Sequence, residues 1–339
     1  MDATQISGLK QLLDSPKTIV VIGHKNPDGD AVGSTLGLAL YLEKLGHLVT
    51  VIMPNDFPKF LKWMPSCDRI LKFDSHTDQS TKLIKKADLI FTLDFNSLSR
   101  IGPMGPVVES LTTPVVMIDH HQAPDDYARF TYSDPIMGST AQMVYHFIEF
   151  FDNTALIDQD IATNLYVGIM TDSGSFRFPS TTSMTHRVIA DLIDKGAQNA
   201  KIHQHVYDAN SPERLKLLGI ALKNMTVLPQ YRTAFTSLSQ QELDSCNFKK
   251  GDSEGFVNYA LSIQNIVLAA IFIESESDKI IKLSLRSKGD FSVNQMARDH
   301  FHGGGHINAA GGRTELSLPE TIQQFISILP TYKEALLHD

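Results

Sequence analysis

Two short apolar strands flanking an amphipathic helix near the start of the chain limit the possible fold more than any other feature. "TIVVIG" (residues 18–23) is a nearly continuous β-branched run, as expected for a strand covered on both faces. "AVGSTLGLALYLEKLG" (31–46) has apolar residues at helical spacing and a terminal glycine that can cap a helix, and "HLVTVIM" (47–53) follows as a second strand. A strand, a helix and a strand in this order predict a parallel sheet.

The rest of the chain extends this pattern into two domains. The 339 residues, 42% of them hydrophobic, are too many for one ordinary core. Further strands are predicted at 87–95, 114–119, 232–239, 266–275 and 280–287, and further helices at 139–151, 159–172, 182–196 and 292–301. We predict an α/β protein: an N-terminal parallel-sheet domain (1–196) with helices on both faces, a helical connector (197–225), and a smaller α/β C-terminal domain (226–339), with the active site in the cleft between the domains.

Composition excludes several classes of protein. A formal net charge of −8 argues against a protein that grips duplex DNA through its phosphates. The two cysteines, Cys67 and Cys246, lie far apart in sequence, so we expect neither a disulfide framework nor a zinc–thiolate site. The longest apolar run, residues 266–273, is far shorter than the roughly 20 residues that span a bilayer. We therefore expect no membrane attachment and a cytoplasmic location.

Polar side chains cluster where the predicted strands end. Open parallel sheets bind ligands outside the carboxyl ends of their strands. The chain places "GHKNPDGD" with His24, Asp28 and Asp30 on one loop after the first strand, and Asp94 in "TLDFNSLSRIG" after a later one. "IDHH" supplies Asp119, His120 and His121, and "GIMTDSGSF" supplies Asp172 at a helix end. A single such Asp is usually a cap or turn former, but these clusters would converge on one small volume.

Such a concentration of carboxylates predicts bound cations. Like charges ~4 Å apart repel by ~4 kcal/mol at an effective dielectric of 20, so the acids must be partly protonated or paired with metal. Five acids and two imidazoles exceed what one open catalytic ion needs, which predicts two divalent ions bridged by one carboxylate, for which Asp94 is the candidate. A mixed oxygen and nitrogen donor set without thiolate favours manganese.

The order and spacing of "GHKNPDGD", "LDFNSLSRIG", "IDHH" and "GIMTDSGSFRF" resemble the motifs of the DHH phosphoesterase family. "RSKGDFSVNQMARDHFHGGGHINAAGG" resembles the signature of the DHH-associated C-terminal domain, and the likeness runs from about residue 17 to residue 313. The resemblance implies that His24, Asp28 and Asp94 bind one manganese and that Asp30, Asp94, His120 and Asp172 bind the other. It also implies catalytic roles for Asp30, Asp119 and His121; we expect His121 to protonate or orient the leaving group.

The late glycine-rich segment is a predicted phosphate site. Gly303, Gly304 and Gly305 lack a Cβ, so their backbone can approach a ligand closely. We expect "INAAGG" after them to begin a short helix whose N-terminus attracts phosphate, and Arg286, Ser287 and His306 to add polar donors. Arg100, six residues after Asp94, is a further candidate for substrate contact, although it is equally compatible with a surface charge.

The resemblance is greatest to compact two-domain members that degrade very short RNA and act on 3′-phosphoadenosine 5′-phosphate. It implies hydrolysis of short single-stranded RNA to mononucleotides and of the bisphosphate nucleotide to AMP, and a homodimer is compatible with it. Three alternatives stay open. A phosphodiesterase for cyclic dinucleotides or their linear products would use the same chemistry. A manganese pyrophosphatase shares these motifs but carries an "SRKKQ"-like motif that is absent here. The non-enzymatic alternative is a nucleotide-binding sensor.

Overall fold

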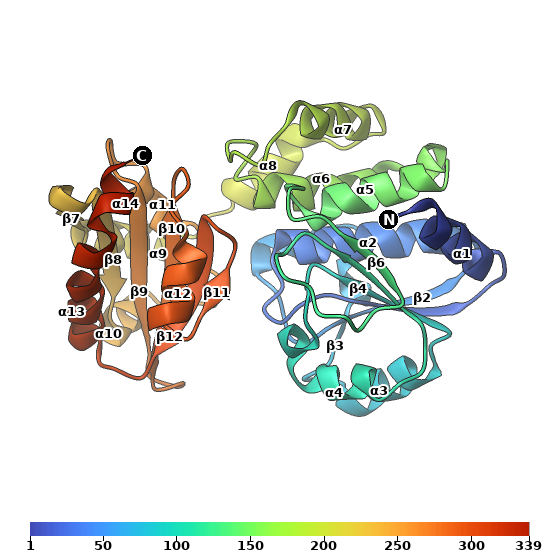
Figure 1. Ribbon diagram of the computed structural model, residues 1–339, viewed down its shortest axis with the longest axis horizontal. Helices are drawn as coiled ribbons and strands as arrows, with labels where there is room; N and C mark the ends of the chain where they lie inside the picture. Colours follow the sequence, from blue (N-terminus) through green and yellow to red (C-terminus); the bar gives the residue numbers. More distant parts are fainter. Residues whose placement is uncertain (339) are drawn as a thin grey trace. The chain divides into compact units, whose positions relative to one another are not determined.

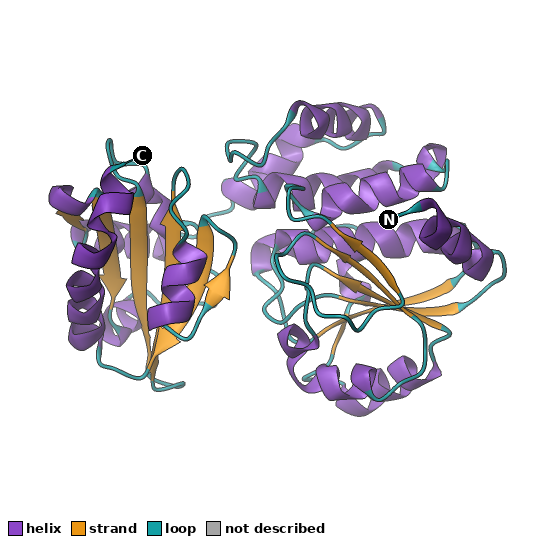
Figure 2. Cartoon of the chain, in the orientation of Figure 1, coloured by secondary structure: helices purple, strands orange, loops and turns teal. Residues whose placement is uncertain are grey.

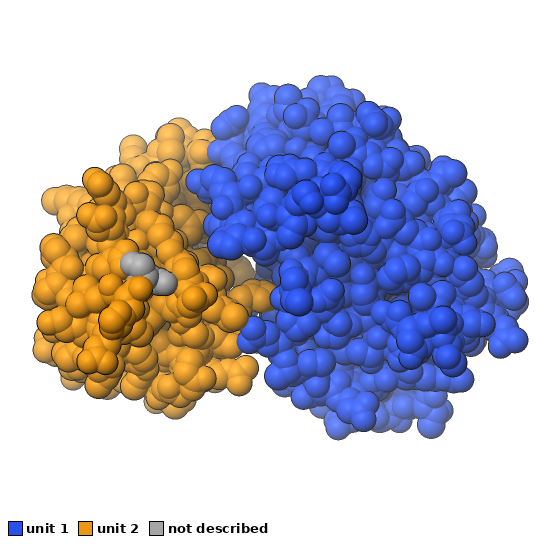
Figure 3. Space-filling view, turned by 45° about the horizontal axis from the view of Figure 1, so that its top comes forward, with its two compact units in different colours: residues 1–209 blue, residues 210–339 orange. Residues whose placement is uncertain are grey.

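The computed structural model describes residues 1–338, which form two compact units, unit 1 up to residue 209 and unit 2 from residue 210 onward (Figure 3). Apart from the short helix expected at "INAAGG", each strand and helix predicted in the sequence analysis is present to within two residues at either end. Both cysteines are free. Among the described helices, none combines the length and the apolar character needed to cross a bilayer.

Unit 1 is built on a six-stranded, wholly parallel sheet in the order β3-β2-β1-β4-β5-β6. Its strands are β1 (Thr18–Ile22), β2 (Leu48–Met53), β3 (Leu71–Lys72), β4 (Leu89–Leu93), β5 (Val115–Asp119) and β6 (Phe130–Ser133). Every residue of β4 and β5 is buried, which explains their unbroken apolar sequences. The predicted parallel sheet is confirmed.

Helices cover both faces of this sheet (Figures 1 and 2). One face packs against α2 (Gly29–Lys44), α5 (Thr140–Phe150) and α6 (Gln159–Asp172), the other against α3 (Thr77–Lys86) and α4 (Gly105–Glu109). The remaining helices are α1 (Ala3–Leu13), α7 (Ser183–Asp194) and α8 (Asn199–Tyr207), with short 3-10 turns at Lys59–Leu61, Cys67–Arg69, Leu98–Met104 and Thr154–Leu156. Two apolar cores therefore sandwich the sheet and fix the positions of its strand ends.

Unit 2 holds a second six-stranded sheet, of mixed direction, in the order β11-β12-β10-β9-β8-β7. The strands are β7 (Thr226–Leu228), β8 (Thr233–Leu238), β9 (Leu268–Ser275), β10 (Ile280–Ser287), β11 (Gly304–Gly305) and β12 (Ala309–Thr314). One face packs against α12 (Val293–His300), α13 (Leu318–Ile328) and α14 (Lys333–Leu337), the other against α9 (Pro212–Lys223), α10 (Gln240–Ser245) and α11 (Phe256–Leu261). The predicted α/β class therefore holds for both units.

Two local expectations are wrong. "INAAGG" does not begin a helix: residues from Ala309 onward form β12, which pairs antiparallel with β10 from Arg286↔Ala309 to Ile281↔Thr314. Pairing with β10 provides hydrogen-bond partners for the backbone of this segment, so it forms no helix whose N-terminus could bind phosphate. Asp30, expected on a loop, lies in the first turn of α2, because the side chain of Asp28 caps that helix by accepting from the backbone N–H groups of Asp30 and Ala31.

Candidate metal centre and active site

The carboxyl ends of β1 and β4 form the centre of the unit 1 site. β2 and β3 lie on one side of β1, whereas β4, β5 and β6 lie on the other, so the strand order reverses between β1 and β4. In open parallel sheets, ligands bind in the crevice at such a point, outside the carboxyl ends of the strands. His24 lies two residues beyond β1, and Asp94 directly follows β4. Both side chains are almost completely buried. Strand order therefore brings together two groups that lie 70 residues apart in sequence.

His24, Asp28 and Asp94 form the first group of donors. Nε2 of His24 lies 3.7 Å from Oδ2 of Asp28 and 3.3 Å from Oδ2 of Asp94. The other ring nitrogen of His24, Nδ1, lies 2.9 Å from the carbonyl oxygen of Lys25. That contact turns Nε2 toward the carboxylates, as in histidines whose second nitrogen is fixed by a backbone carbonyl while the first binds metal.

Asp30, His120 and Asp172 form the second group. Nε2 of His120 lies 3.8 Å from Asp30 Oδ2 and 3.4 Å from Asp172 Oδ2. Nδ1 of His120 lies 3.1 Å from the carbonyl oxygen of Met137, so this ring is oriented in the same way as that of His24. Asp172 is the last residue of α6 and remains partly exposed, with 28% of its side chain accessible.

Asp94 joins the two groups. Its Oδ2 faces His24, whereas its Oδ1 lies 3.4 Å from Nε2 of His120. The hydroxyl of Thr140 also donates to Oδ1, at 3.1 Å. The backbone of Asp94 has a φ of +65°, a left-handed conformation that non-glycine residues seldom adopt. Strain of this kind is retained where it positions a functional side chain.

Close packing of α2 against α6 brings Asp30 near Asp172. A Cβ at Gly33 of α2 would lie 2.4 Å from the carbonyl oxygen of Asn164 in α6, and a Cβ at Gly168 would lie 2.9 Å from Oδ1 of Asp30. Glycine at these positions therefore allows the two helices to approach each other. The carboxylate of Asp30 is then held by the N-terminus of α5, where the N–H groups of Thr140 and Ala141 donate to it at 2.6 and 2.8 Å.

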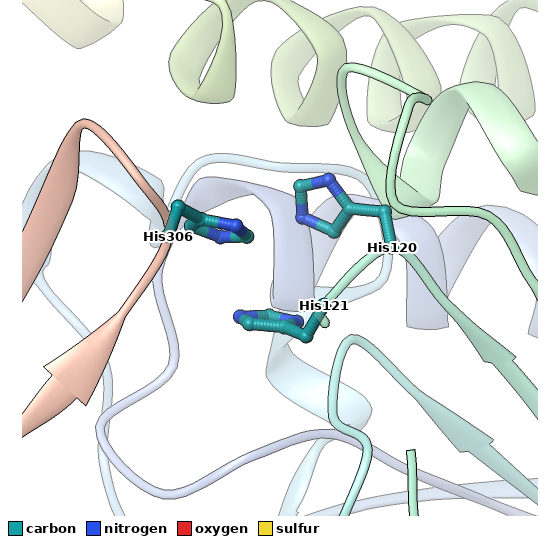
Figure 4. A group of neighbouring side chains, drawn as sticks. All are labelled: His120, His121 and His306. Carbon is teal, nitrogen blue, oxygen red and sulfur yellow. The ribbon is translucent and has the colours of Figure 1, made fainter. Parts of the chain in front are cut away.

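The second histidine of the "DHH" run has a different partner. Nδ1 of His121 lies 2.7 Å from Oδ1 of Asp119, and the backbone N–H of His121 donates to Oδ2 of the same carboxylate at 3.0 Å. Asp119 is fully buried. The rings of His120 and His121 lie 5.0 Å apart and are tilted by 72° (Figure 4). Asp119 thus fixes the orientation of His121, whose Nδ1 also lies 3.8 Å from Oδ1 of Asp94, so that Asp94, Asp119 and His121 form a further group of possible metal donors.

The crowding of carboxylates and histidines in the cluster shifts the pKa values of several of its members. Burial lowers the pKa of His24, but the interactions with the nearby carboxylates of Asp28 and Asp94 outweigh burial and raise that pKa to about 10. The pKa of His120 is also raised well above its usual range, because Asp94 and the neighbouring carboxylates outweigh its burial. Burial, together with the charges of Asp94 and Asp172, raises the pKa of Asp30 well above its usual range. These directions are those expected where several carboxylates crowd around two histidines.

The donor geometry fits divalent ions. Donors that share one small divalent ion at bond lengths of ~2.1 Å lie ~3.0–3.5 Å apart. The Nε2 atoms of His24 and His120 lie 3.3–3.8 Å from the carboxylate oxygens around them, longer than most hydrogen bonds and close to that range. All donors are carboxylate oxygens or imidazole nitrogens, and both ligand histidines are oriented by backbone carbonyls. The residues of these groups could therefore hold metal.

Sequence reasoning missed Thr140 and the carbonyl of Met137, both of which orient members of the cluster. Neither residue type is distinctive in sequence. Arg100 lies in the 3-10 turn after β4, where its carbonyl oxygen accepts a hydrogen bond from the N–H of Lys25 at 2.9 Å. It is therefore part of the wall beside His24.

The other predicted substrate residues belong to unit 2. Arg286 and Ser287 end β10, and Asn308 donates to the hydroxyl of Ser287 at 2.9 Å. His306 lies between β11 and β12. A Cβ at Gly303 would lie 2.0 Å from the carbonyl oxygen of Gly311, and one at Gly305 would lie 2.4 Å from that of Ala309. Both glycines are thus required by strand packing, whereas a Cβ at Gly304 would meet no atom closer than 3.5 Å.

Comparisons with known proteins agree with this site. Residues 18–169 match the DHH family, N-terminal domain, and residues 238–333 match the DHHA1 domain. The chain is 32% identical to the bifunctional oligoribonuclease and PAP phosphatase NrnA of Thermus thermophilus, over 86% of this chain and 83% of that protein. It is 25% identical to the cyclic-di-AMP phosphodiesterase GdpP of Geobacillus thermodenitrificans, over 96% of this chain and 49% of that protein.

A solved structure provides the same fold over the whole chain. The crystal structure of an exopolyphosphatase-related protein from Bacteroides fragilis superimposes with a TM-score of 0.95 at 39% identity, covering 99% of this chain and 98% of that one. Together with the two domain matches, these likenesses establish the family independently of the motifs. The chain belongs to the DHH family, and it is a hydrolase that acts on phosphate esters.

Proposed function

We propose that the protein is a manganese-dependent phosphoesterase that degrades short single-stranded RNA to mononucleotides and converts 3′-phosphoadenosine 5′-phosphate to AMP. The observation that carries this proposal is the position of the Asp94 carboxylate between the two donor groups. Its Oδ2 faces His24 of the first group, and its Oδ1 faces His120 of the second. The relative from Thermus thermophilus, which is named for both activities, supports the choice of substrates.

The proposed ion ligands are His24, Asp28 and Asp94 on one side, and Asp30, Asp94, His120 and Asp172 on the other. The donor set without thiolate favours manganese. Two such ions supply Lewis-acid stabilisation of phosphate charge and lower the pKa of water. The N-terminus of α5 holds Asp30 with its Oδ2 3.8 Å from Nε2 of His120.

His121 is the proposed general acid. Water adds to phosphorus and releases one proton to solvent, the bond from phosphorus to the ribose oxygen breaks, and His121 gives a proton to the departing oxygen, which leaves as a hydroxyl group. Asp119 is a positioning residue: its bonds to the ring and the backbone of His121 leave Nε2 as the ring atom that can exchange a proton with substrate. Arg286, Ser287, Gly304 and His306 of unit 2, with Arg100 of unit 1, are the proposed contacts to the rest of the substrate.

Parallel turnover assays test the proposal. Purified protein is given manganese and, separately, 3′-phosphoadenosine 5′-phosphate, RNA oligomers of two to ten nucleotides, and a long RNA. We expect release of phosphate from the bisphosphate, mononucleotides from the shortest oligomers, and little cleavage of the long strand. Failure to turn over both the bisphosphate and the short oligomers would contradict the proposal.

A second candidate is a phosphodiesterase for cyclic dinucleotides or their linear products. The likeness to a cyclic-di-AMP phosphodiesterase over 96% of this chain favours including it, although the chain spans only about half of that protein. Cyclic and linear adenine dinucleotides in the same assay separate the candidates. Faster hydrolysis of the cyclic form than of either primary substrate would support the second one.

A further inference from the structure

Two cationic side chains lie on hydrogen-bonded backbone beside the metal centre. Lys25 directly follows His24, and its N–H donates to the carbonyl oxygen of Arg100 at 2.9 Å. The described residues include no carboxylate that forms an ion pair with Lys25 or Arg100 within 4.0 Å. Cations next to so acidic a cluster would ordinarily be neutralised by it. These two are instead available to an external anion.

The loop that carries Lys25 is held at several points. The ring of His24 contacts the carbonyl of Lys25, and the N–H of Asn26, which has a φ of +58°, donates to Oδ1 of Asn55 at 2.8 Å. A Cβ at Gly102 would lie 3.9 Å from Cδ of Lys25, which places the aliphatic part of this exposed lysine along the turn that also contains Arg100. The Lys25 stem is thus directed toward the Arg100 turn.

The substrates in question differ in how many phosphates they carry. Both 3′-phosphoadenosine 5′-phosphate and 5′-phosphorylated oligomers contain one phosphate that is hydrolysed and a second that is retained. The hydrolysed group belongs at the metal centre. A lysine and an arginine on adjoining backbone next to His24 provide the charge and the donors that a second phosphate needs.

We propose that Lys25 and Arg100 form a subsite on unit 1 for the retained phosphate of the substrate. The subsite makes the enzyme selective for substrates with two phosphate groups over monophosphates with the same base and sugar. This inference rests on the proposed function and adds to it a specificity-determining residue, Lys25, which lies in "GHKNPDGD" but is not among the predicted site residues.

The test compares two substrates in three variants. The substrates are 3′-phosphoadenosine 5′-phosphate and adenosine 3′-phosphate, which differ only in the retained phosphate. Lys25→Ala should raise KM for the bisphosphate about tenfold, the size of one charge-assisted hydrogen bond, and leave KM for the monophosphate unchanged. Lys25→Arg keeps the charge and should restore KM to within about twofold of the wild-type value.

The matched control is Lys85→Ala. Lys85 is an exposed lysine in the last turn of α3. Because α3 leads into the start of β4, Lys85 lies near the amino ends of the strands, whereas His24 lies at their carboxyl ends. Its removal should change neither KM. An equal rise for both substrates in Lys25→Ala, or no rise for either, would overturn the subsite. A wild-type protein that hydrolyses neither the bisphosphate nor a 5′-phosphorylated dinucleotide would contradict the proposed function, and the subsite with it.

Discussion

At the scale of single residues, a variant of Asp119 tests whether this residue positions His121 or binds metal. Asp119→Asn keeps the size of the side chain but removes the carboxylate that fixes His121. We expect kcat to fall by ~10²–10⁴-fold while bound manganese is retained, because general-acid catalysis contributes about that much. Elemental analysis after gel filtration and steady-state kinetics measure both quantities. His121→Ala and the double variant should lose about as much as Asp119→Asn alone, and loss of metal from any of them would contradict the assignment.

Asp94 and Asp28 provide a second comparison at this scale. Asp94 faces both donor groups, whereas Asp28 belongs only to the first. Asp94→Asn should therefore remove most of both ions. Asp28→Asn should weaken only one, and it should leave the fold intact because asparagine caps a helix as well as aspartate does. Manganese stoichiometry by equilibrium dialysis measures the difference, and equal stoichiometry in the two variants would contradict a bridging Asp94.

The residues of the cluster could be chosen from sequence because aspartate and histidine at strand ends are chemically conspicuous. The structure places the Nε2 atoms of His24 and His120 3.3–3.8 Å from carboxylate oxygens of the four predicted aspartate ligands. Thr140 could not be chosen, since a threonine at a helix start usually serves only as a local cap. Its contact with Asp94 spans 46 residues and exists only in the folded chain.

At the scale of helices and strands, the α2–α6 contact depends on missing side chains. Gly168→Ala would place a Cβ 2.5 Å from that of Ala141 as well as against Asp30. We expect a loss of ~1–3 kcal/mol in unfolding free energy, as for overpacking in a core, together with weaker manganese binding. Urea unfolding measures the first quantity. The control is Gly219→Ala in α9, where the new Cβ meets nothing within 4 Å and should stabilise by up to ~1 kcal/mol. An equal change in unfolding free energy for the two variants would show that Gly168 is not tightly packed against Ala141 and Asp30.

Periodicity sufficed for the long buried elements but not for the short or glycine-rich ones. β3 has two residues and β6 has four, too few for a pattern, and α3 is short and polar. "INAAGG" was wrongly expected to be helical, because glycine next to alanine carries little information about secondary structure. Its strand conformation is set by pairing with β10 and by the contact of Gly303 with Gly311, both of which are tertiary.

At the scale of the whole molecule, the metal-free protein should depend on pH in a way that the loaded protein does not. The pKa of His24 is raised to about 10 and that of His120 is raised in the same direction. A histidine whose folded pKa exceeds its unfolded pKa stabilises the fold fully below about pH 6.5, and this stabilisation is lost as pH rises toward 10. Unit 1 without metal should therefore become less stable across that interval.

Manganese should remove this dependence, because an ion supplies positive charge that does not titrate in the same range. At a hundredfold excess over Kd it should also stabilise the protein by ~2.7 kcal/mol. Thermal unfolding from pH 6.5 to 10, with EDTA or with manganese, measures both effects, and hydrogen exchange assigns them to a unit. Since every proposed ion ligand lies within residues 1–209, protection should increase there and not in unit 2. A pH-independent melting temperature in EDTA would mean that protonated histidines do not compensate the carboxylates, and that another group holds the empty centre together.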